Sequence, residues 1–265
     1  MEVRGPAGFM ARSPDATREL FHRLTKQARC TSRTPDAEQV HNLRVAIRRF
    51  NQALELYEDA PGLRKIHRRL KKTMALAGQV RDADIATKLV GKLKRAGAGT
   101  LQAKLAHRRM EGEKQLVTAL PALATNGHFE MPSGAGKLPV DAIHDAVKRL
   151  FKRGAKAEDA NGLHRLRIAA KKLRYTLELL APRHGRLEQI KRLQSLLGDI
   201  NDYETARRII AEESGGKKLL AQLEDRQNKK IREFRRYWKS DFDGDGNIQQ
   251  WMAELSHPRK AAARA

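Results

Sequence analysis

Residues 40–49 read VHNLRVAIRR, and the same pattern returns as LHRLRIAAKK at residues 163–172. Histidine aligns with histidine, arginine with arginine, and the paired bases that end one copy with paired bases in the other. A repeat that keeps its charged row as faithfully as its apolar row indicates that both rows have a role, one structural and one directed at a ligand. The positive charge of that row predicts an anionic ligand.

A helical arrangement separates the two rows. At about 100° per residue, the apolar positions of each copy fall on one stripe and the polar positions on the opposite one. In both copies the polar stripe carries a histidine, an arginine and a further base at positions i, i+3 and i+7. A solvated face needs charge of any kind and does not need this pattern. The pattern therefore favours two amphipathic helices whose basic faces meet a ligand.

A second block repeats downstream of each copy, as LAGQVRDAD beginning at position 76 and LLGDINDYE beginning at position 196. Its glycines, Gly78 and Gly198, follow apolar and basic helical patterns and precede an aspartate, which predicts a corner between two helices. Asp82 and Asp202 would then cap the next helix, pair with a neighbouring base, or tune a binding site.

These two blocks together resemble the CHAD domain, the conserved histidine α-helical domain, over about residues 14–240. The resemblance implies an all-α fold of two pseudo-symmetric helical bundles around a basic central cavity that binds inorganic polyphosphate. One position departs from the family pattern. The arginine that the family tends to carry ten residues after the histidine is present as Arg174 but is Asn51 in the first copy, which leaves open whether the two halves contribute equally.

The expected mechanism is electrostatic coordination without catalysis. If a pseudo-twofold axis relates the repeats, the two basic rows face one another across the cavity, joined by bases of the following helices. Arginine forks bind phosphate oxygens bidentately, lysine acts as a mobile point charge, and histidine near a polyanion is biased towards its charged form. The expected polyphosphate-binding residues are His41, Arg44, Arg48, Arg49, Lys72, His164, Arg167, Lys171, Lys172, Arg174, Tyr175 and Arg192.

Composition agrees with a polyanion partner. The chain has 54 Lys and Arg against 31 Asp and Glu, a formal net charge of +23. Its single cysteine, Cys30, excludes a disulfide within the chain and fits a reducing compartment. No apolar stretch approaches the ~20 residues that a membrane span needs. We expect a cytoplasmic protein without a membrane partner, in a position to associate with polyphosphate granules.

Breaks in the helical pattern predict how the chain is organised. We expect a flexible N-terminus at residues 1–13, a first helical half at 14–124, a linker with several Gly and Pro at 125–139, a second half at 140–240, and a polar turn with a basic tail at 241–265.

The sequence DFDGDGNI at residues 241–248 resembles the start of an EF-hand calcium loop. Met252 stands where such a loop needs a bidentate glutamate, so a polar turn is favoured over a weak calcium site. We expect no metal ion and no cofactor.

Two rival functions remain at this stage. Charge alone does not distinguish a polyphosphate-binding protein from a nucleic-acid-binding protein. Against nucleic acid, aromatic residues make up only 5% of the chain and no recognised nucleic-acid-binding motif occurs. The second rival is a metal-dependent polyphosphate hydrolase or phosphotransferase, in which Glu55, Glu178, Asp82 and Asp202 would hold Mg²⁺.

Overall fold

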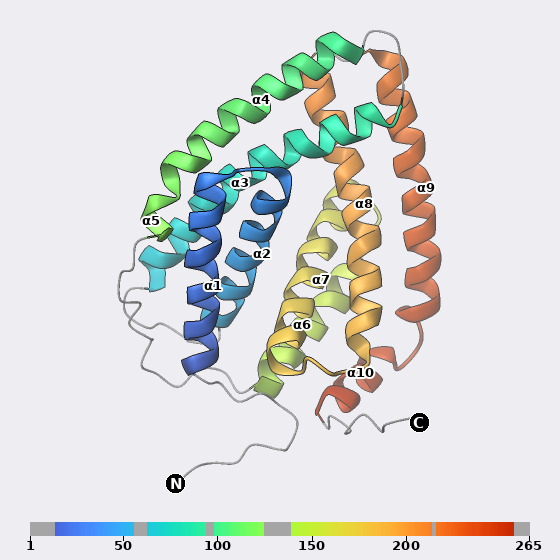
Figure 1. Cartoon of the computed structure of the whole chain (residues 1–265). Helices are drawn as coiled ribbons and strands as arrows, with labels where there is room; N and C mark the ends of the chain where they lie inside the picture. Colours follow the sequence, from blue (N-terminus) through green and yellow to red (C-terminus); the bar gives the residue numbers. More distant parts are fainter. Residues whose placement is uncertain (1–13, 56–62, 94–97, 125–138, 214–215, 257–265) are drawn as a thin grey trace, which may run out of the picture.

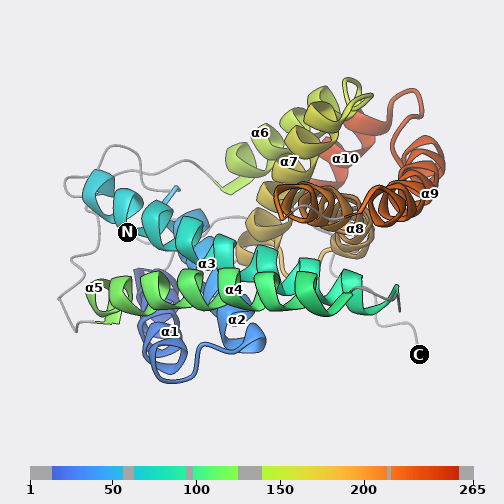
Figure 2. The ribbon, with the colours of Figure 1, turned by 90° about the horizontal axis from the view of Figure 1, so that it is seen from above.

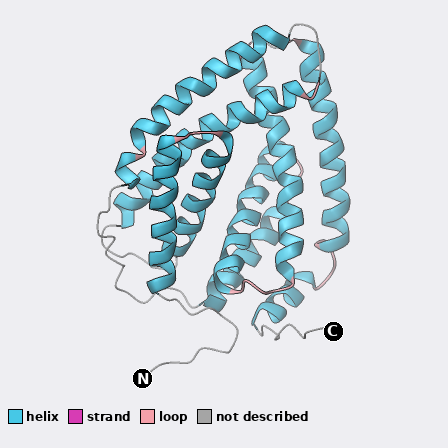
Figure 3. Ribbon diagram, viewed as in Figure 1, coloured by secondary structure: helices cyan, strands magenta, loops and turns pink. Residues whose placement is uncertain are grey.

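The computed structural model describes residues 14–55, 63–93, 98–124, 139–213 and 216–256. Every regular element within these ranges is a helix (Figures 1 and 3). The prediction of an all-α fold is therefore confirmed. None of the described helices is long and apolar enough to cross a membrane.

The first half of the chain forms α1 (Pro14–Arg33), α2 (Ala37–Leu54), α3 (Leu63–Gly91), α4 (Ala98–Ala119) and the short α5 (Pro121–Ala124). Helix α2 carries the first copy of the repeat, and the side chain of Asp36 caps it by accepting a hydrogen bond from the Gln39 amide at 2.8 Å. The predicted apolar stripe is buried at its described members, Val40, Leu43, Ile47, Phe50 and Leu54. Tyr57, which the pattern also assigns to this stripe, lies outside the described residues.

The second half forms α6 (Pro139–Gly154), α7 (Ala160–Leu180), α8 (Arg186–Glu212), α9 (Lys217–Asp241) and α10 (Asn247–Ser256). Helix α7 carries the second copy, and Asp159 caps it as Asp36 caps α2, here with the Gly162 amide at 2.6 Å. Helices α6, α7, α8 and α9 pack against one another in the same order as α1, α2, α3 and α4. Whether the two halves superpose as related bundles stays a prediction.

Three hydrophobic clusters hold the molecule together. One lies within the first half, a second lies within the second half, and a third joins the carboxyl-terminal parts of α3 and α8 to α4 and α9. The halves also contact each other through α2 and α7. Seen from above, α1–α5 lie on one side of the molecule and α6–α10 on the other (Figure 2).

The predicted corners at Gly78 and Gly198 are wrong, because α3 and α8 run through both positions without a break. A glycine inside a helix costs only about 1 kcal/mol relative to alanine, which the long apolar faces of α3 and α8 offset. At Gly78 the missing side chain also has a use. A Cβ there would lie 3.1 Å from Nη1 of Arg44. Asp82 and Asp202 therefore cap nothing, and lie in mid-helix.

The C-terminal part of the chain is more ordered than a polar turn and tail. Residues Asn247–Ser256 form α10, which packs on α6 and buries Trp251 and Leu255 completely. Phe242 stacks on Trp238 with ring centroids 4.9 Å apart. Since α10 begins at Asn247, the second half of a 12-residue calcium loop is helical here, and the EF-hand conformation is not formed. The N-terminus, most of the expected linker and the last residues of the expected tail, at 1–13, 125–138 and 257–265, lie outside the described residues.

Candidate anion-binding site

The repeat places its basic rows where the two halves meet. Five cationic side chains converge from α2, α3 and α7, accompanied by one carboxylate from α3 and one from α8, and each affects the ionisation of several of the others. We call this group the central cluster. Its members are Arg44, Arg48, Arg81, Arg167, Lys171, Asp82 and Asp202.

Arg44 lies on α2 and is largely buried. Burial, with repulsion from Arg48 as a second cause, lowers the pKa of its guanidinium to about 10. Its Nη1 donates a hydrogen bond to the Met74 carbonyl oxygen at 3.3 Å, beside the space that Gly78 leaves open. This arginine is thus held in place although its charge is poorly solvated.

Lys171 lies across the interface on α7. Burial lowers the pKa of its ammonium from 10.5 to about 6, and repulsion from Arg167 and Arg48 adds to this effect. Without a bound anion, Lys171 is therefore mostly uncharged at neutral pH. A negatively charged ligand would reverse this balance by stabilising the protonated form.

Arg167 stands between these groups. Burial is the largest cause of its lowered pKa, and Arg48 adds repulsion. Its Nε is buried and has no hydrogen-bond partner within the described structure. A buried donor left unsatisfied costs about 1–3 kcal/mol, so the arrangement favours an added acceptor.

The two aspartates only partly offset this charge. Burial raises the pKa of both Asp82 and Asp202, while neighbouring guanidinium groups lower it. The central cluster therefore has four guanidinium groups and the Lys171 amine against two carboxylates. Some charges farther out are paired, as in the contact of Lys230 Nζ with Asp199 at 3.3 Å.

The repeated histidines border the central cluster. Burial, followed by repulsion from Arg81, lowers the pKa of His41. Burial and repulsion from Arg167 lower the pKa of His164, against the effect of a hydrogen bond to Asn201. Both imidazoles are solvent-exposed, so both are open to a ligand arriving from solution.

Other predicted site residues form a reciprocal set of ion pairs between the halves. Nη2 of Arg49 lies 3.3 Å from Glu178, and Nζ of Lys172 lies 2.5 Å from Glu55. Arg49 corresponds to Lys172 in the repeat, and Glu55 corresponds to Glu178, so each half supplies one base and one acid. Arg174 adds a 2.7 Å contact to the Glu178 carboxylate. These three bases share two carboxylates, so each of them already has a nearby counter-charge.

The last three predicted residues have different surroundings. Lys72 is exposed on α3. The guanidinium of Arg192 lies 4.4 Å above the Tyr237 ring of α9. Tyr175 is buried and lines a separate cavity that also borders Arg49.

The sequence prediction omitted Arg81, which lowers the pKa of His41, Arg44 and Asp202. The second copy has asparagine at the equivalent position, and a search for bases common to both copies therefore passes over it. A signal was nevertheless present. Arg81 lies one helical turn after Gly78, on the face that Arg44 contacts.

Among the described residues, no group of three or more His, Cys, Asp or Glu is arranged to hold a metal ion. Glu55 and Glu178, which one rival hypothesis assigned to Mg²⁺, contact Lys172 and Arg49 instead. The central cluster therefore consists of guanidinium groups and one amine beside two carboxylates whose pKa burial raises.

The fold and the central cluster together define an all-helical protein whose two halves enclose a surplus of basic side chains. The chain belongs to the CHAD domain family, because the family model matches residues 15–211, about three quarters of its length. The predicted resemblance is confirmed.

Two solved structures share the fold. The crystal structure of the CHAD domain from the plant Ricinus communis aligns with a TM-score of 0.57 and 20% sequence identity, covering 96% of this chain and 94% of that one. PptA from Streptomyces chartreusis aligns with a TM-score of 0.60 and 15% identity, covering 84% of this chain and 99% of that one. No curated protein matches the sequence significantly.

Proposed function

We propose that this protein binds inorganic polyphosphate at the central cluster and does not turn it over. The observation that carries the proposal is the grouping of four partly buried guanidinium groups and the Lys171 amine beside only two carboxylates, with the Arg167 Nε unsatisfied. Burying like charges together is costly unless an anion compensates them. Phosphate oxygens supply both the missing negative charge and the missing hydrogen-bond acceptors.

The spacing of the bases favours a chain of phosphates over a single one. Arg44 and Arg48 lie one turn apart on α2, and Arg167 and Lys171 lie one turn apart on α7. A helical turn rises about 5.4 Å, so the cationic groups form an elongated site between the halves. Several successive phosphates of a linear polymer can be neutralised there at once.

The protonation of the site residues is also consistent with a polyanionic ligand. Lys171, His41 and His164 all have lowered pKa values in the unliganded protein. A bound polyanion would raise these values, so binding would take up protons and strengthen as the pH falls from about 8 to 6. Counterion release would make the affinity fall steeply with salt, by analogy with nucleic-acid binding.

Nucleic acid remains the first rival, and the described aromatic contacts argue against it. The closely packed rings, such as the Trp238–Phe242 stack and the Phe21–Phe50 pair, belong to the hydrophobic cores. Among the residues that the structure describes, no row of rings follows the central cluster to stack successive bases. The hydrolase alternative predicts orthophosphate release from polyphosphate with Mg²⁺ or Mn²⁺, and our proposal predicts none.

The decisive experiment separates position from total charge. The double variant Arg48→Glu, Lys171→Glu removes four units from the formal net charge of +23, and so does the control Lys217→Glu, Lys218→Glu. Both control lysines are exposed in the first turn of α9, where acidic residues favour the helix. We expect the first variant to lose at least about 100-fold in affinity for long-chain polyphosphate, because close-range repulsion replaces two contacts.

The control should lose only a few-fold, and added salt should erase its effect. Circular dichroism would verify that both variants are helical, and competition among polyphosphate, single-stranded RNA and duplex DNA would establish the ligand class. Equal losses in the two folded variants would reduce the site to a diffuse basic surface. Equal displacement by DNA would favour the nucleic-acid rival. A polyphosphate-binding protein of this kind should also colocalise with polyphosphate granules in the cytoplasm.

A further inference from the structure

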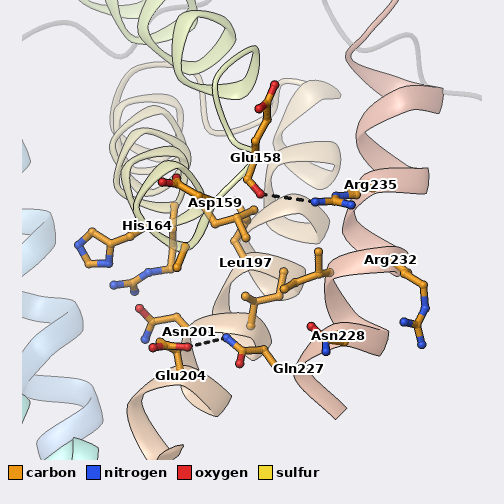
Figure 4. A pocket seen from close by; sticks show the side chains of 15 residues that line it. Glu158, Asp159, His164, Leu197, Asn201, Glu204, Gln227, Asn228, Arg232 and Arg235 are labelled. Carbon is orange, nitrogen blue, oxygen red and sulfur yellow. Dashed lines mark hydrogen bonds between the residues drawn. The ribbon is translucent and has the colours of Figure 1, made fainter. Parts of the chain in front are cut away.

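A second cavity adjoins the central cluster, between α7, α8 and α9, and we call it the α9 pocket. Its volume is about 390 Å³. Figure 4 shows Arg232 and Arg235 on its α9 side and His164 on the side nearest the first half of the chain. The pocket thus extends from the outer helix towards the interface between the halves.

The walls of the α9 pocket differ in chemistry from the central cluster. The residues that line it include three acids and three arginines, namely Glu158, Asp159, Glu204, Arg167, Arg232 and Arg235. Several of their polar groups are already engaged: Asp159 caps α7, Glu204 accepts from Gln227, and Arg235 donates to the backbone oxygen of Glu158, whose carboxylate points away from the pocket (Figure 4). An apolar floor of Leu163, Leu197, Ile200 and Ile231 suits an uncharged, partly apolar group.

Its polar groups are partly fixed in position. The buried Gln227 donates from Nε2 to Glu204 at 2.9 Å and accepts from Arg207 at 2.9 Å (Figure 4). Asn201 and Asn228 also line the pocket, and an amide offers both a donor and an acceptor. Carboxylates and amides of this kind suit the hydroxyl groups of a sugar and the amino and ring nitrogens of a heterocycle.

Arg167 connects the two compartments. It lines the α9 pocket, and its charge also acts on Arg44, Lys171 and Asp202 in the central cluster. One ligand can therefore place a polyanionic part in the central cluster and an uncharged part in the α9 pocket. We infer that the protein also binds nucleoside polyphosphates, with the phosphate chain in the central cluster and the nucleoside in the α9 pocket. This inference rests on the proposed phosphate-binding role of the cluster.

The test compares adenosine 5′-tetraphosphate with inorganic tetraphosphate by isothermal titration calorimetry. The inorganic anion carries the greater charge when fully ionised, because a second free end replaces the ester. Electrostatics alone therefore favours the inorganic ligand. We expect the nucleotide to bind about tenfold more tightly, which corresponds to about 1.4 kcal/mol from the nucleoside.

A pocket-filling variant locates this preference. Asn228→Trp adds a large ring to an exposed position of the pocket, and Gln222→Trp adds the same ring to an exposed position of α9 outside the pocket lining. Asn228→Trp should abolish the tenfold preference and leave inorganic tetraphosphate binding unchanged. Gln222→Trp should keep both.

Each other outcome has a definite meaning. If wild-type protein binds inorganic tetraphosphate but binds the nucleotide no more tightly, the inference is overturned and the proposed function stands. A preference that survives Asn228→Trp overturns the assignment to the α9 pocket. If neither tetraphosphate nor long-chain polyphosphate binds, the proposed function itself fails.

Discussion

The substitution Lys171→Met should stabilise the unliganded protein while weakening its affinity for polyphosphate. Methionine keeps the length and apolar character of the buried stem and removes the amine, whose pKa burial and three neighbouring arginines lower from 10.5 to about 6. Wild-type protein must either bury this charge or give up its proton on folding. The variant has neither cost.

The pH dependence follows from proton counting. Between about pH 6 and 10.5 the unfolded lysine binds a proton that the folded lysine lacks, so wild-type stability rises with pH across this window. The penalty is complete below about pH 6 and absent above about pH 10.5. At about pH 7.5, the pH lies three units below the pKa of the unfolded lysine, so the penalty is at most about 4 kcal/mol at 1.36 kcal/mol per unit. At about pH 9.5 the penalty shrinks to roughly 1 kcal/mol.

Urea denaturation at these two pH values measures the difference, with Lys218→Met as the exposed control. We expect Lys171→Met to be more stable than wild type by about 1–4 kcal/mol at about pH 7.5, with a smaller gain at about pH 9.5. The control should change little at either pH. Polyphosphate should raise the unfolding free energy of wild type more than that of Lys171→Met. A gain that is absent, or that does not shrink with rising pH, would refute the reasoning.

The remaining predictions concern other parts of the molecule. Calorimetry at about pH 7.5 in two buffers of different ionisation enthalpy should show net proton uptake on polyphosphate binding, because the anion favours protonated Lys171; identical apparent enthalpies would count against this coupling. A double-mutant cycle to alanine at Arg49 and Glu178 should give a coupling free energy of at most about 1 kcal/mol that salt reduces, since Arg49 is 43% exposed; a value unaffected by salt would contradict a screened ion pair. Truncation after Ser240 should destabilise the protein by roughly 3 kcal/mol or more, because it removes the fully buried Trp251; an unchanged thermal midpoint would show that α10 adds nothing to the core.

The repeat was sufficient to predict the two helices that carry it, with their buried faces, but gave no sign of α10, where a polar turn and tail were expected. The apolar stripe of α2 is buried from Val40 to Leu54, because a period of about 3.6 residues specifies a helix face without reference to its partner. The same pattern was sufficient to predict which bases oppose that stripe. The pattern wrongly predicted a helix end at Gly78 and at Gly198. There the local helix-ending signals compete with long apolar faces that pack on either side and keep α3 and α8 continuous.

Composition and spacing along one chain are enough to predict the all-α class, the family and the basic rows. Which of those bases lack counter-charges depends on how the helices pack. Arg49 and Lys172 meet Glu178 and Glu55 across the interface, whereas Lys171 is buried among arginines. Charge interaction depends on distance and burial between segments far apart in sequence, and periodicity encodes neither. For the same reason Arg81 joins the site only when α3 packs against α8.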